Sequence, residues 1–525
     1  MAVAVAKDSP ESGTGTSRAR VKFVTAWGLL LAAKLAYALT MPLFGDEAFY
    51  AWAGLHPAWA YSDLPGGTAA LTALGTALAG DTVFGVRFAF VLLGAALPWL
   101  VVRLARRLGD ETDAWRAGLW SLPIPLLLPM GVMALPDVLL TVAALAALDA
   151  CAGLLRKDGR AGALYLQLGL ALAVGAFAHY RFAPLLLIGA LAFLASGGLQ
   201  RLREPGLWAA LAVGALGWAP MLAHNLGTDA AGLRFQLFER HPWSFHAEGL
   251  AQPLLQAVIT TPLLYALFGW ALWRAWRTMP STLPRFLVLA GVGLWLFYAL
   301  LAPFVDRARF SLHWPIPAYL VAATLLPAAL RQSRGFALRL APWAAGLAVA
   351  ATLAMLALFA VPASPTLAAR SAGTALYPDN FVGWREVAAA IRPRLEDGDA
   401  LVADHFMLAA QLSFELDQRR EVFVLDHWNN HKHGRAAQIA QWGYDEAGMK
   451  GLAAGRRAWI AFEIGETPER DRAAWVNRLC RWFDDVKPVA VVEGPGGGKR
   501  FWLYRGVRRA AGADAGGCRV ALPQP

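Results

Sequence analysis

The sequence predicts a mainly helical protein that spans a membrane many times and carries a small α/β domain at its C-terminal end. Of the 525 residues, 57% are hydrophobic and only 16% are charged, which is too apolar for a soluble protein of this size. Up to about residue 361 the apolar residues come in blocks long enough to cross a bilayer as helices. From about residue 362 charged residues become frequent again and the apolar runs are shorter.

The chain divides into four segments. Residues 1–23 are rich in Ala, Ser, Gly and charge, and we expect a disordered cytoplasmic tail. Residues 24–361 form the predicted transmembrane domain. Its first run, 24–44, is interrupted by Lys34 but is long enough to span, so we expect a retained helix rather than a cleaved signal peptide. The other predicted spans are 84–104, 115–134, 137–155, 162–179, 182–200, 206–224, 251–273, 285–303, 313–330 and 340–361.

Basic residues occur in every second gap between these runs. The gaps hold Arg103, Arg106, Arg107 and Arg116; Arg156, Lys157 and Arg160; Arg201 and Arg203; Arg274, Arg277 and Arg285; and Arg331, Arg334 and Arg339. Because cytoplasmic loops are enriched in Lys and Arg, about eleven helices with the N-terminus inside and the C-terminus outside are predicted. The same rule explains the net charge of +11, so we expect no nucleic-acid partner.

The predicted outer domain covers residues 362–507. Strands are expected at 400–404, 422–426, 458–463, 489–493 and 501–505, with helices at 382–394, 405–416 and 466–483. An Ala- and Gly-rich tail, 508–525, is expected to be disordered. A disulfide between Cys480 and Cys518 is open at this point, and it requires the domain to be extracytoplasmic.

The gaps on the opposite side collect the remaining ionisable residues. They hold Asp46, Glu47, Asp63, Asp81, Asp137, His179 to Arg181, the segment 224–248, and Asp306 to Arg309. Asp46 and Glu47 are adjacent carboxylates next to a membrane helix, with no Lys or Arg near them in the sequence. Charges close to hydrocarbon are costly and usually serve a function. The structural alternative is that both acids only cap a short helix.

These outer residues fit group transfer better than the two other functions considered. A transporter would need ionisable groups at mid-membrane in broken helices, and a scaffold would need none. A sugar on a polyprenyl phosphate leaves as a phosphate ester, so the reaction needs nearby cations more than a general acid. The attacking hydroxyl needs a carboxylate such as Asp46 to take its proton. The candidate cations and sugar-binding rings are Arg181, Arg307, Arg309, Tyr50, Trp52, Tyr61 and Tyr180. A lipid or polysaccharide flippase or transporter stays as the alternative.

Several motifs resemble those of one family. Gly45-Asp46-Glu47-Ala48-Phe49-Tyr50 is similar to the Asp-Glu motif of GT-C glycosyltransferases, in particular the bacterial protein O-mannosyltransferase-like and aminoarabinose lipid A transferase group. Tyr61-Ser62-Asp63-Leu64-Pro65 resembles the Tyr-x-Asp/Glu-Lys-Pro motif of that group. Further similar stretches are Leu135-Pro136-Asp137, His313-Trp314-Pro315-Ile316-Pro317-Ala318-Tyr319, and Pro378-Asp379-Asn380 with Gly383-Trp384. The resemblance covers about residues 24–506.

The resemblance implies an inverting transfer of a monosaccharide from a polyprenyl-phosphate donor at the outer face of a bacterial inner membrane. The acceptor would be a lipid, a lipopolysaccharide or, as a third option, a protein. The active site and the C-terminal domain would be periplasmic, in contact with membrane lipid. Asp46 would be the base, and Glu47 would orient it rather than act as a second base.

The remaining site residues are expected to bind substrate. Leu64 stands where relatives have Lys near the donor phosphate, so Arg181 with Arg307 or Arg309 is expected to take over part of that role. The full substrate-binding set is Tyr50, Tyr61, Asp63, Asp137, Tyr180, Arg181, Arg307, Arg309 and His313. No cofactor is required, although a divalent cation near Asp46 is compatible with the family. The histidines at 224, 241 and 246 lack zinc-ligand spacing, and those at 427, 431 and 433 favour a polar loop.

Overall fold

The computed structural model describes residues 10–157, 160–228, 230–241, 243–305, 311–416, 420–510, 512 and 518–523. The chain divides into two compact units. The first, here called the helical unit, contains Met1–Ala36, Ala89–Leu226 and His241–Leu356. The second, here called the mixed unit, contains Tyr37–Phe88, Gly227–Arg240 and Ala357–Pro525.

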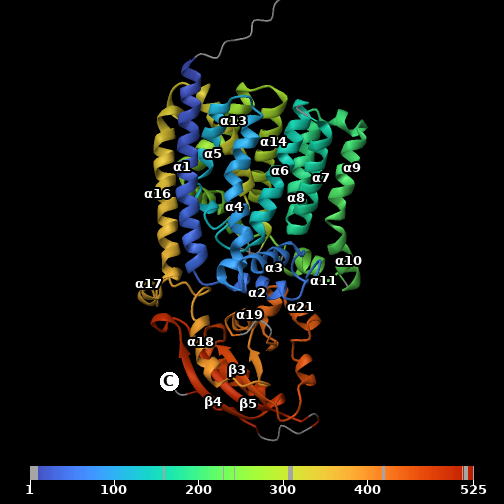
Figure 1. Ribbon diagram of the computed structural model, residues 1–525, viewed down its shortest axis with the longest axis vertical. Coiled ribbons are helices and arrows are strands. Elements are labelled where there is room, and N and C mark those ends of the chain that lie inside the picture. Colours follow the sequence, from blue (N-terminus) through green and yellow to red (C-terminus); the bar gives the residue numbers. More distant parts are fainter. Residues whose placement is uncertain are drawn as a thin grey trace, which may run out of the picture. The chain divides into compact units, whose positions relative to one another are not determined.

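Seven stretches of the described residues are long and apolar enough to cross a membrane, and each corresponds to one of the predicted spans. Five of them are single helices: α4 (Val83–Arg106), α6 (Pro136–Arg156), α7 (Ala161–Ala178), α14 (Thr282–Leu301) and α16 (Phe336–Ala363). Another lies in α1 (Pro10–Thr40), and the seventh joins α9 (Pro205–Leu216) to α10 (Ala219–Gly227). Most of these helices run along the bundle in Figure 1.

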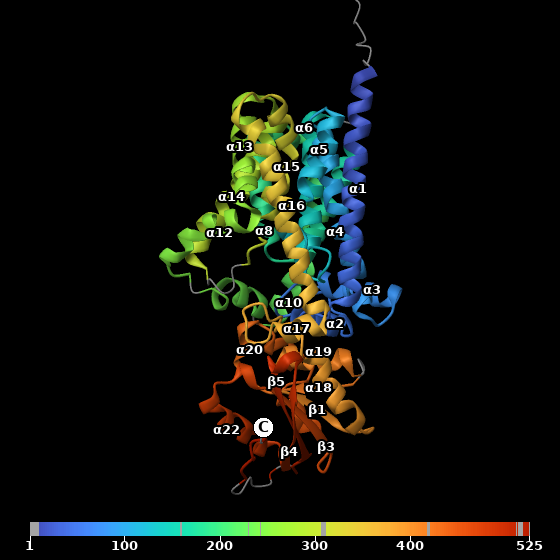
Figure 2. The same ribbon diagram turned by 90° about the vertical axis from the view of Figure 1, so that its left-hand side faces the viewer.

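The other four predicted spans take different forms. The expected span 251–273 becomes α12 (Gln252–Thr260) and α13 (Pro262–Thr278), which belong to a helix pair bent by 109° and visible in Figure 2. The bend falls at Thr261, whose φ is +74°, just before a proline. The spans 182–200 and 313–330 are the shorter helices α8 (Phe182–Ala195) and α15 (Ile316–Arg331).

The prediction of a single helix over 115–134 is wrong. Helix α5 (Glu111–Ser121) ends early and a 3-10 turn follows at Pro125–Leu127. Three prolines between residues 123 and 129 account for the break, because each lacks a backbone N–H and clashes with the preceding turn of a helix.

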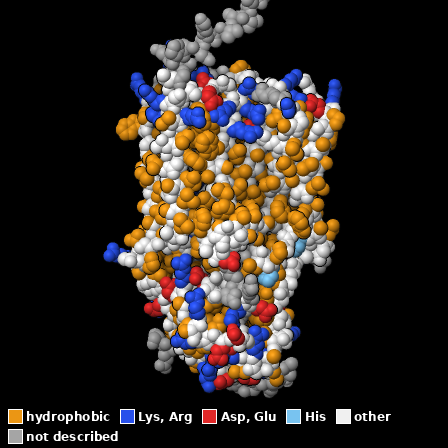
Figure 3. All heavy atoms as spheres, in the orientation of Figure 1, with side chains coloured by type: hydrophobic (Ala, Val, Ile, Leu, Met, Phe, Trp, Pro, Cys, Tyr) orange, Lys and Arg blue, Asp and Glu red, His pale blue; other side chains and the backbone are white. Residues whose placement is uncertain are grey.

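Helix α15 forms the centre of the helical unit. From Ile316 to Leu330 every residue is buried, and the helix packs against α5, α13 and α14. In contrast, α16 is exposed over most of its length although it is almost entirely apolar. Figure 3 shows the same character on the face drawn, where hydrophobic side chains cover the helices. Such a surface suits contact with lipid.

The basic segments between the predicted helices lie together at one end of the helical unit. Arg331 Nε is 2.7 Å from Asp113 Oδ2, Arg201 donates to the Leu154 carbonyl at 2.5 Å, and Arg156 donates to the Arg107 carbonyl. Lys and Arg gather at this end, which Figure 3 draws at the top. The alternation of charge along the sequence is therefore a feature of the fold. That this end faces the cytoplasm stays a prediction.

A five-stranded sheet organises the mixed unit, with the order β2-β1-β3-β5-β4. Its strands are β1 (Ala400–Ala403), β2 (Val422–Val424), β3 (Arg457–Glu463), β4 (Phe483–Glu493) and β5 (Arg500–Arg508). The first three strands are parallel, and β5 runs antiparallel to both β3 and β4. The expected helices appear as α18 (Trp384–Ile391), α19 (Phe406–Glu415) and α22 (Glu469–Asn477). The third is shorter than expected because the chain enters β4 at Phe483 to pair with Arg508.

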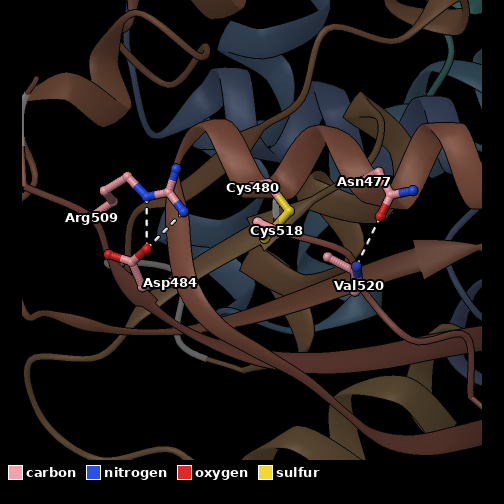
Figure 4. Close-up of a disulfide and its surroundings, with 6 residues drawn as sticks. All are labelled: Asn477, Cys480, Asp484, Arg509, Cys518 and Val520. Atoms are coloured by element: carbon pink, nitrogen blue, oxygen red, sulfur yellow. Dashed lines mark hydrogen bonds and ion pairs between the residues drawn. A yellow bond between two sulfur atoms is a disulfide. The ribbon is translucent and has the colours of Figure 1, made fainter. Parts of the chain in front are cut away.

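Cys480 and Cys518 form a disulfide with a Cα–Cα distance of 5.9 Å, shown in Figure 4. Two residues further on, the backbone N–H of Val520 donates to Asn477 Oδ1 at 2.8 Å. The sequence predicted disorder from residue 508, but the described tail residues 518–523 include this covalent link and this hydrogen bond. A bond that closes a loop stabilises a domain chiefly by restricting its unfolded state.

Candidate functional site

The acidic stretch after the first long helix forms a short helix, α2 (Gly45–Gly54). Asp46 and Glu47 occupy its first turn, where negative charge interacts favourably with the helix dipole. The Glu47 carboxylate accepts the backbone N–H of Phe44 at 2.9 Å, so this residue caps the helix. The alternative interpretation, in which the two acids only cap a short helix, therefore describes Glu47 well.

Glu47 is closed off from solvent by an arginine that the sequence analysis missed. Arg87 Nε donates to Glu47 Oε1 at 2.8 Å, and Arg87 Nη2 donates to Glu47 Oε2 at 2.7 Å, a bidentate pair. Both side chains are fully buried. The guanidinium also donates to the Met41 and Pro42 carbonyls at 2.7 and 2.8 Å. Glu47 therefore holds α2 in position and has no free oxygen for proton transfer.

Asp46 belongs to a second cluster centred on Arg435. Arg435 Nη1 lies 2.9 Å from Asp46 Oδ1, and Arg435 Nε lies 3.2 Å from Asp63 Oδ2. Arg435 Nη2 is 3.5 Å from the Tyr50 hydroxyl. The Arg435 side chain is 3% exposed and that of Asp63 is 6% exposed, whereas Asp46 is 28% exposed. Asp46 is thus the carboxylate of this cluster that reaches solvent.

The charges of the cluster differ from residue to residue. Burial opposes ionisation of Asp46, but the attraction of Arg435, helped by His433 and Arg240, lowers the pKa of its carboxyl below the usual range. At Asp63 burial dominates over Arg435 and raises the pKa of the carboxyl. Burial also lowers the pKa of His433 to about 4, so this imidazole is neutral at pH 7. Asp46 is accordingly ionised at neutral pH, as a base must be.

The fold explains how Arg435 reaches this place. It follows β2 on a segment that contains α20 (Trp428–Lys432) and leads into α21 (Ala436–Gln441). In sheets of parallel strands, functional groups gather at the carboxyl ends of the strands, and this segment leaves that end of β2. Gly434 turns the chain with a φ of +71°, which glycine adopts without strain, and its carbonyl accepts the Ser62 hydroxyl at 2.7 Å. Arg435 is thereby placed beside Asp63.

The predicted aromatic residues around Asp46 are mostly engaged in packing. Tyr61 is buried and its hydroxyl donates to the Ala53 carbonyl at 3.0 Å. Trp52 is buried as well, stacked on Tyr444 with ring centroids 5.6 Å apart and packed against Trp442. A role for Tyr50 and Tyr61 in binding substrate stays a prediction.

A different cluster of predicted residues forms within the helical unit. Arg181 Nη2 lies 2.8 Å from Asp137 Oδ1, and His313 Nε2 lies 3.0 Å from Asp137 Oδ2. The guanidinium of Arg181 stacks over Trp314 at 4.7 Å from the ring centroid. Residues from three segments between predicted helices, far apart in the sequence, therefore lie together. The placement of their charges predicted this. Arg181 is 16% exposed and His313 is 29% exposed, so both reach the surface of the helical unit.

The remaining predicted residues are less informative. The Tyr180 hydroxyl accepts from Asn225 Nδ2 at 3.3 Å in the helical unit. Arg307 and Arg309 lie outside the described residues. Arg87 and Arg435 were missed. Arg87 is marked in the sequence as a charge inside an apolar run, whereas Arg435 follows the histidine-rich loop and has nothing near it that marks it.

Comparison with known proteins agrees with this fold. Residues 63–224 match the model of the dolichyl-phosphate-mannose-protein mannosyltransferase family. No curated protein matches the chain in a sequence search. The crystal structure of ArnT from Cupriavidus metallidurans in the apo state superposes with a TM-score of 0.64 and 15% identity, covering 92% of this chain and 97% of that one.

Two further structures extend the comparison. ArnT from Cupriavidus metallidurans bound to undecaprenyl phosphate gives a TM-score of 0.67 and 16% identity over 92% of this chain and 97% of that chain. The arabinofuranosyltransferase AftD from Mycobacteria gives 0.51 and 14% over 94% of this chain and 40% of that chain. At these identities the structural matches establish the fold alone. The chain therefore has the fold of ArnT and AftD, and its residues 63–224 are similar to the mannosyltransferase family.

Proposed function

We propose that this protein transfers a monosaccharide from a polyprenyl-phosphate donor to a hydroxyl of a lipid or lipopolysaccharide at the outer face of the inner membrane, with inversion at the anomeric carbon. The observation that carries the proposal is the partly exposed, ionised carboxylate of Asp46 beside a set of buried charges. One solved structure with this fold is bound to undecaprenyl phosphate, which supports a polyprenyl-phosphate donor.

The proposed reaction is a single displacement. The acceptor hydroxyl attacks the anomeric carbon while the bond from that carbon to the phosphate oxygen breaks, and polyprenyl phosphate leaves as an anion. Asp46 takes the proton of the hydroxyl, because its carboxylate is the exposed one of its cluster. Arg181 is proposed to stabilise the charge that develops on the phosphate, since its guanidinium reaches the surface of the helical unit.

The outer location is supported by the disulfide. Disulfides persist in oxidising compartments such as the periplasm and are rare in the cytosol. The bond between Cys480 and Cys518 therefore favours a periplasmic C-terminal domain. The alternation of basic gaps along the sequence favours the same orientation.

The test is to incubate the purified protein in detergent with radiolabelled polyprenyl-phosphate sugars and bacterial membrane extracts. A transferase consumes its donor in detergent and labels an extract component, whereas a flippase or transporter needs a sealed bilayer. Labelled lipid or lipopolysaccharide would support the proposed acceptor. Labelled protein would show instead that the acceptor is a protein. Donor that remains intact with every sugar and extract would overturn the proposal. Because no step uses a metal, activity is expected to survive a chelator.

A further inference from the structure

Arg435 sits at the centre of the Asp46 cluster, yet the proposed reaction assigns it no step. It is almost completely buried, and its two carboxylate partners are Asp46 and Asp63. Taking an arginine out of water requires compensation, and a single cation here compensates two carboxylates. Removing it would leave the buried Asp63 carboxyl and the partly exposed Asp46 carboxylate without the cation that they share.

The surroundings of Arg435 keep its guanidinium in one place. Its Cζ atom lies 4.1 Å from the centroid of the Phe49 ring and 4.4 Å from that of the Phe406 ring. These two rings come from α2 and α19, and cation–π contacts of this kind add to the ion pairs. With 3% of its side chain exposed, Arg435 lies behind Asp46 and does not reach a substrate directly. Any effect on the reaction must therefore pass through Asp46.

We propose that Arg435 is a positioning residue that fixes the carboxylate of Asp46 and balances its charge against that of Asp63. This inference rests on the proposed function, in which Asp46 is the base. Asp46 Oδ1 faces Arg435, which sets the orientation of the carboxylate and leaves the other oxygen for the acceptor hydroxyl. Because Arg435 follows β2, the C-terminal domain contributes directly to the site.

The charged groups facing Asp46 give the proposal a measurable consequence. They are Arg435, His433 and Arg240, and Asp63 pairs with the same Arg435. His433 is neutral at pH 7, so Arg435 supplies the largest attraction. An opposite charge this close typically lowers a carboxyl pKa by about 1–3 units. Without Arg435 the pKa of Asp46 should rise, and the rate should begin to fall at a higher pH as the medium is acidified.

The experiment compares Arg435→Met with the unchanged protein over a pH series, at saturating donor. We expect kcat to fall by about 10–100-fold, because loss of about 1 Å of positional accuracy has effects of that order. The acid limb of the profile should move up by about one pH unit or more, and the donor KM should change little. Arg435→Lys should recover part of kcat, since it restores a charge without the bidentate geometry.

Two additional variants separate this role from a structural one. Asp63→Asn in the Arg435→Met background should return the acid limb toward its original position, because it removes the like charge. Arg457→Met is the matched control: Arg457 also bridges two carboxylates, at 2.8 Å from Asp399 and 2.7 Å from Glu396, elsewhere in the same domain. It should leave kcat and the acid limb unchanged. If Arg435→Met melts early, Arg435→Gln, which keeps hydrogen-bond donors, replaces it.

The outcomes distinguish this inference from the proposed function. An inactive Asp46→Asn together with an Arg435 variant of normal kcat and unmoved acid limb would overturn the role of Arg435 alone. A loss of kcat with an unmoved acid limb, not altered by Asp63→Asn, would also overturn it. An active Asp46→Asn would instead remove the base on which both depend.

Discussion

At the scale of single residues, two adjacent carboxylates have opposite fates. Glu47 has both oxygens bound by Arg87 and is fully buried. Asp46 is partly exposed and forms an ion pair with Arg435. This difference follows from their directions on α2, because consecutive helical residues point about 100° apart. It favours Asp46 over Glu47 as the base, and an orienting role for Glu47 stays a prediction.

Asp46→Asn should lower turnover by about 10²–10⁴-fold while donor binding and folding survive, because an amide keeps the shape but cannot accept the proton. Asp46→Glu should also be poor, since the extra methylene moves the carboxylate by about 1 Å. Glu47→Gln should lower turnover less. The measurement is the initial rate at saturating donor, with a thermal melt of each variant. Near-normal turnover of Asp46→Asn would refute the assignment.

Arg181→Ala should weaken donor use by about 2–3 kcal/mol in kcat/KM, the scale of a lost charge-assisted contact in a site. Arg181→Lys should recover part of this, because a point charge can still meet a phosphate. Arg181 also pairs with Asp137, so Asp137→Asn is the control for effects of the pair itself. Unchanged turnover and donor affinity in Arg181→Ala would place the phosphate contact elsewhere.

At the scale of elements, the buried pair of Glu47 and Arg87 joins α2 to the beginning of α4. The guanidinium also donates to the Ala38 carbonyl in α1 and to the Met41 and Pro42 carbonyls in the connection between α1 and α2. Three elements are thus held by one side chain that is fully buried. The direction in which α2 presents Asp46 depends on this arrangement.

Arg87→Met should destabilise the protein by about 3–5 kcal/mol, because it leaves the Glu47 carboxylate buried without a partner. Adding Glu47→Gln should restore part of the stability by removing that charge. The measurement is thermal unfolding in detergent. Arg106→Met is the control, since its pair with Glu111 is exposed on both sides and should contribute little. Equal melting of the Arg87 and Arg106 variants would contradict the expected importance of the buried pair.

At the scale of the whole molecule, two independent features favour an extracytoplasmic C-terminal domain. One is the alternation of basic gaps, which meet at one end of the helical unit. The other is the disulfide between Cys480 and Cys518. The first depends on the membrane and the second on the redox state of a compartment, so their agreement is informative.

A phosphatase fused after Leu367 should therefore be active, because that enzyme folds only outside the cytoplasm. Leu367 lies in α17 (Pro365–Arg370), just after the last apolar helix. A reporter that works only in the cytoplasm, fused at the same place, should be inactive. A strong signal from the cytoplasmic reporter would overturn both the orientation and the outer location of the site.

The sequence alone determined the arrangement of apolar helices and the α/β character of the C-terminal part of the chain. Each depends on residues close together in the chain: apolar runs, alternating strand patterns and charges in the gaps. The prolines after Ser121 are equally visible in the sequence, and their effect on a helix outweighs that of the apolar run around them.

Only the tertiary structure decided which charges meet. Glu47 is bound by an arginine 40 residues away, and Asp63 by one 372 residues away. Such pairs depend on how helices and strands pack, which local periodicity does not contain. The sequence therefore predicted the carboxylates of the candidate site, whereas folding determined that Arg87 and Arg435 are their partners. A buried charge without an opposite charge beside it is strongly destabilising.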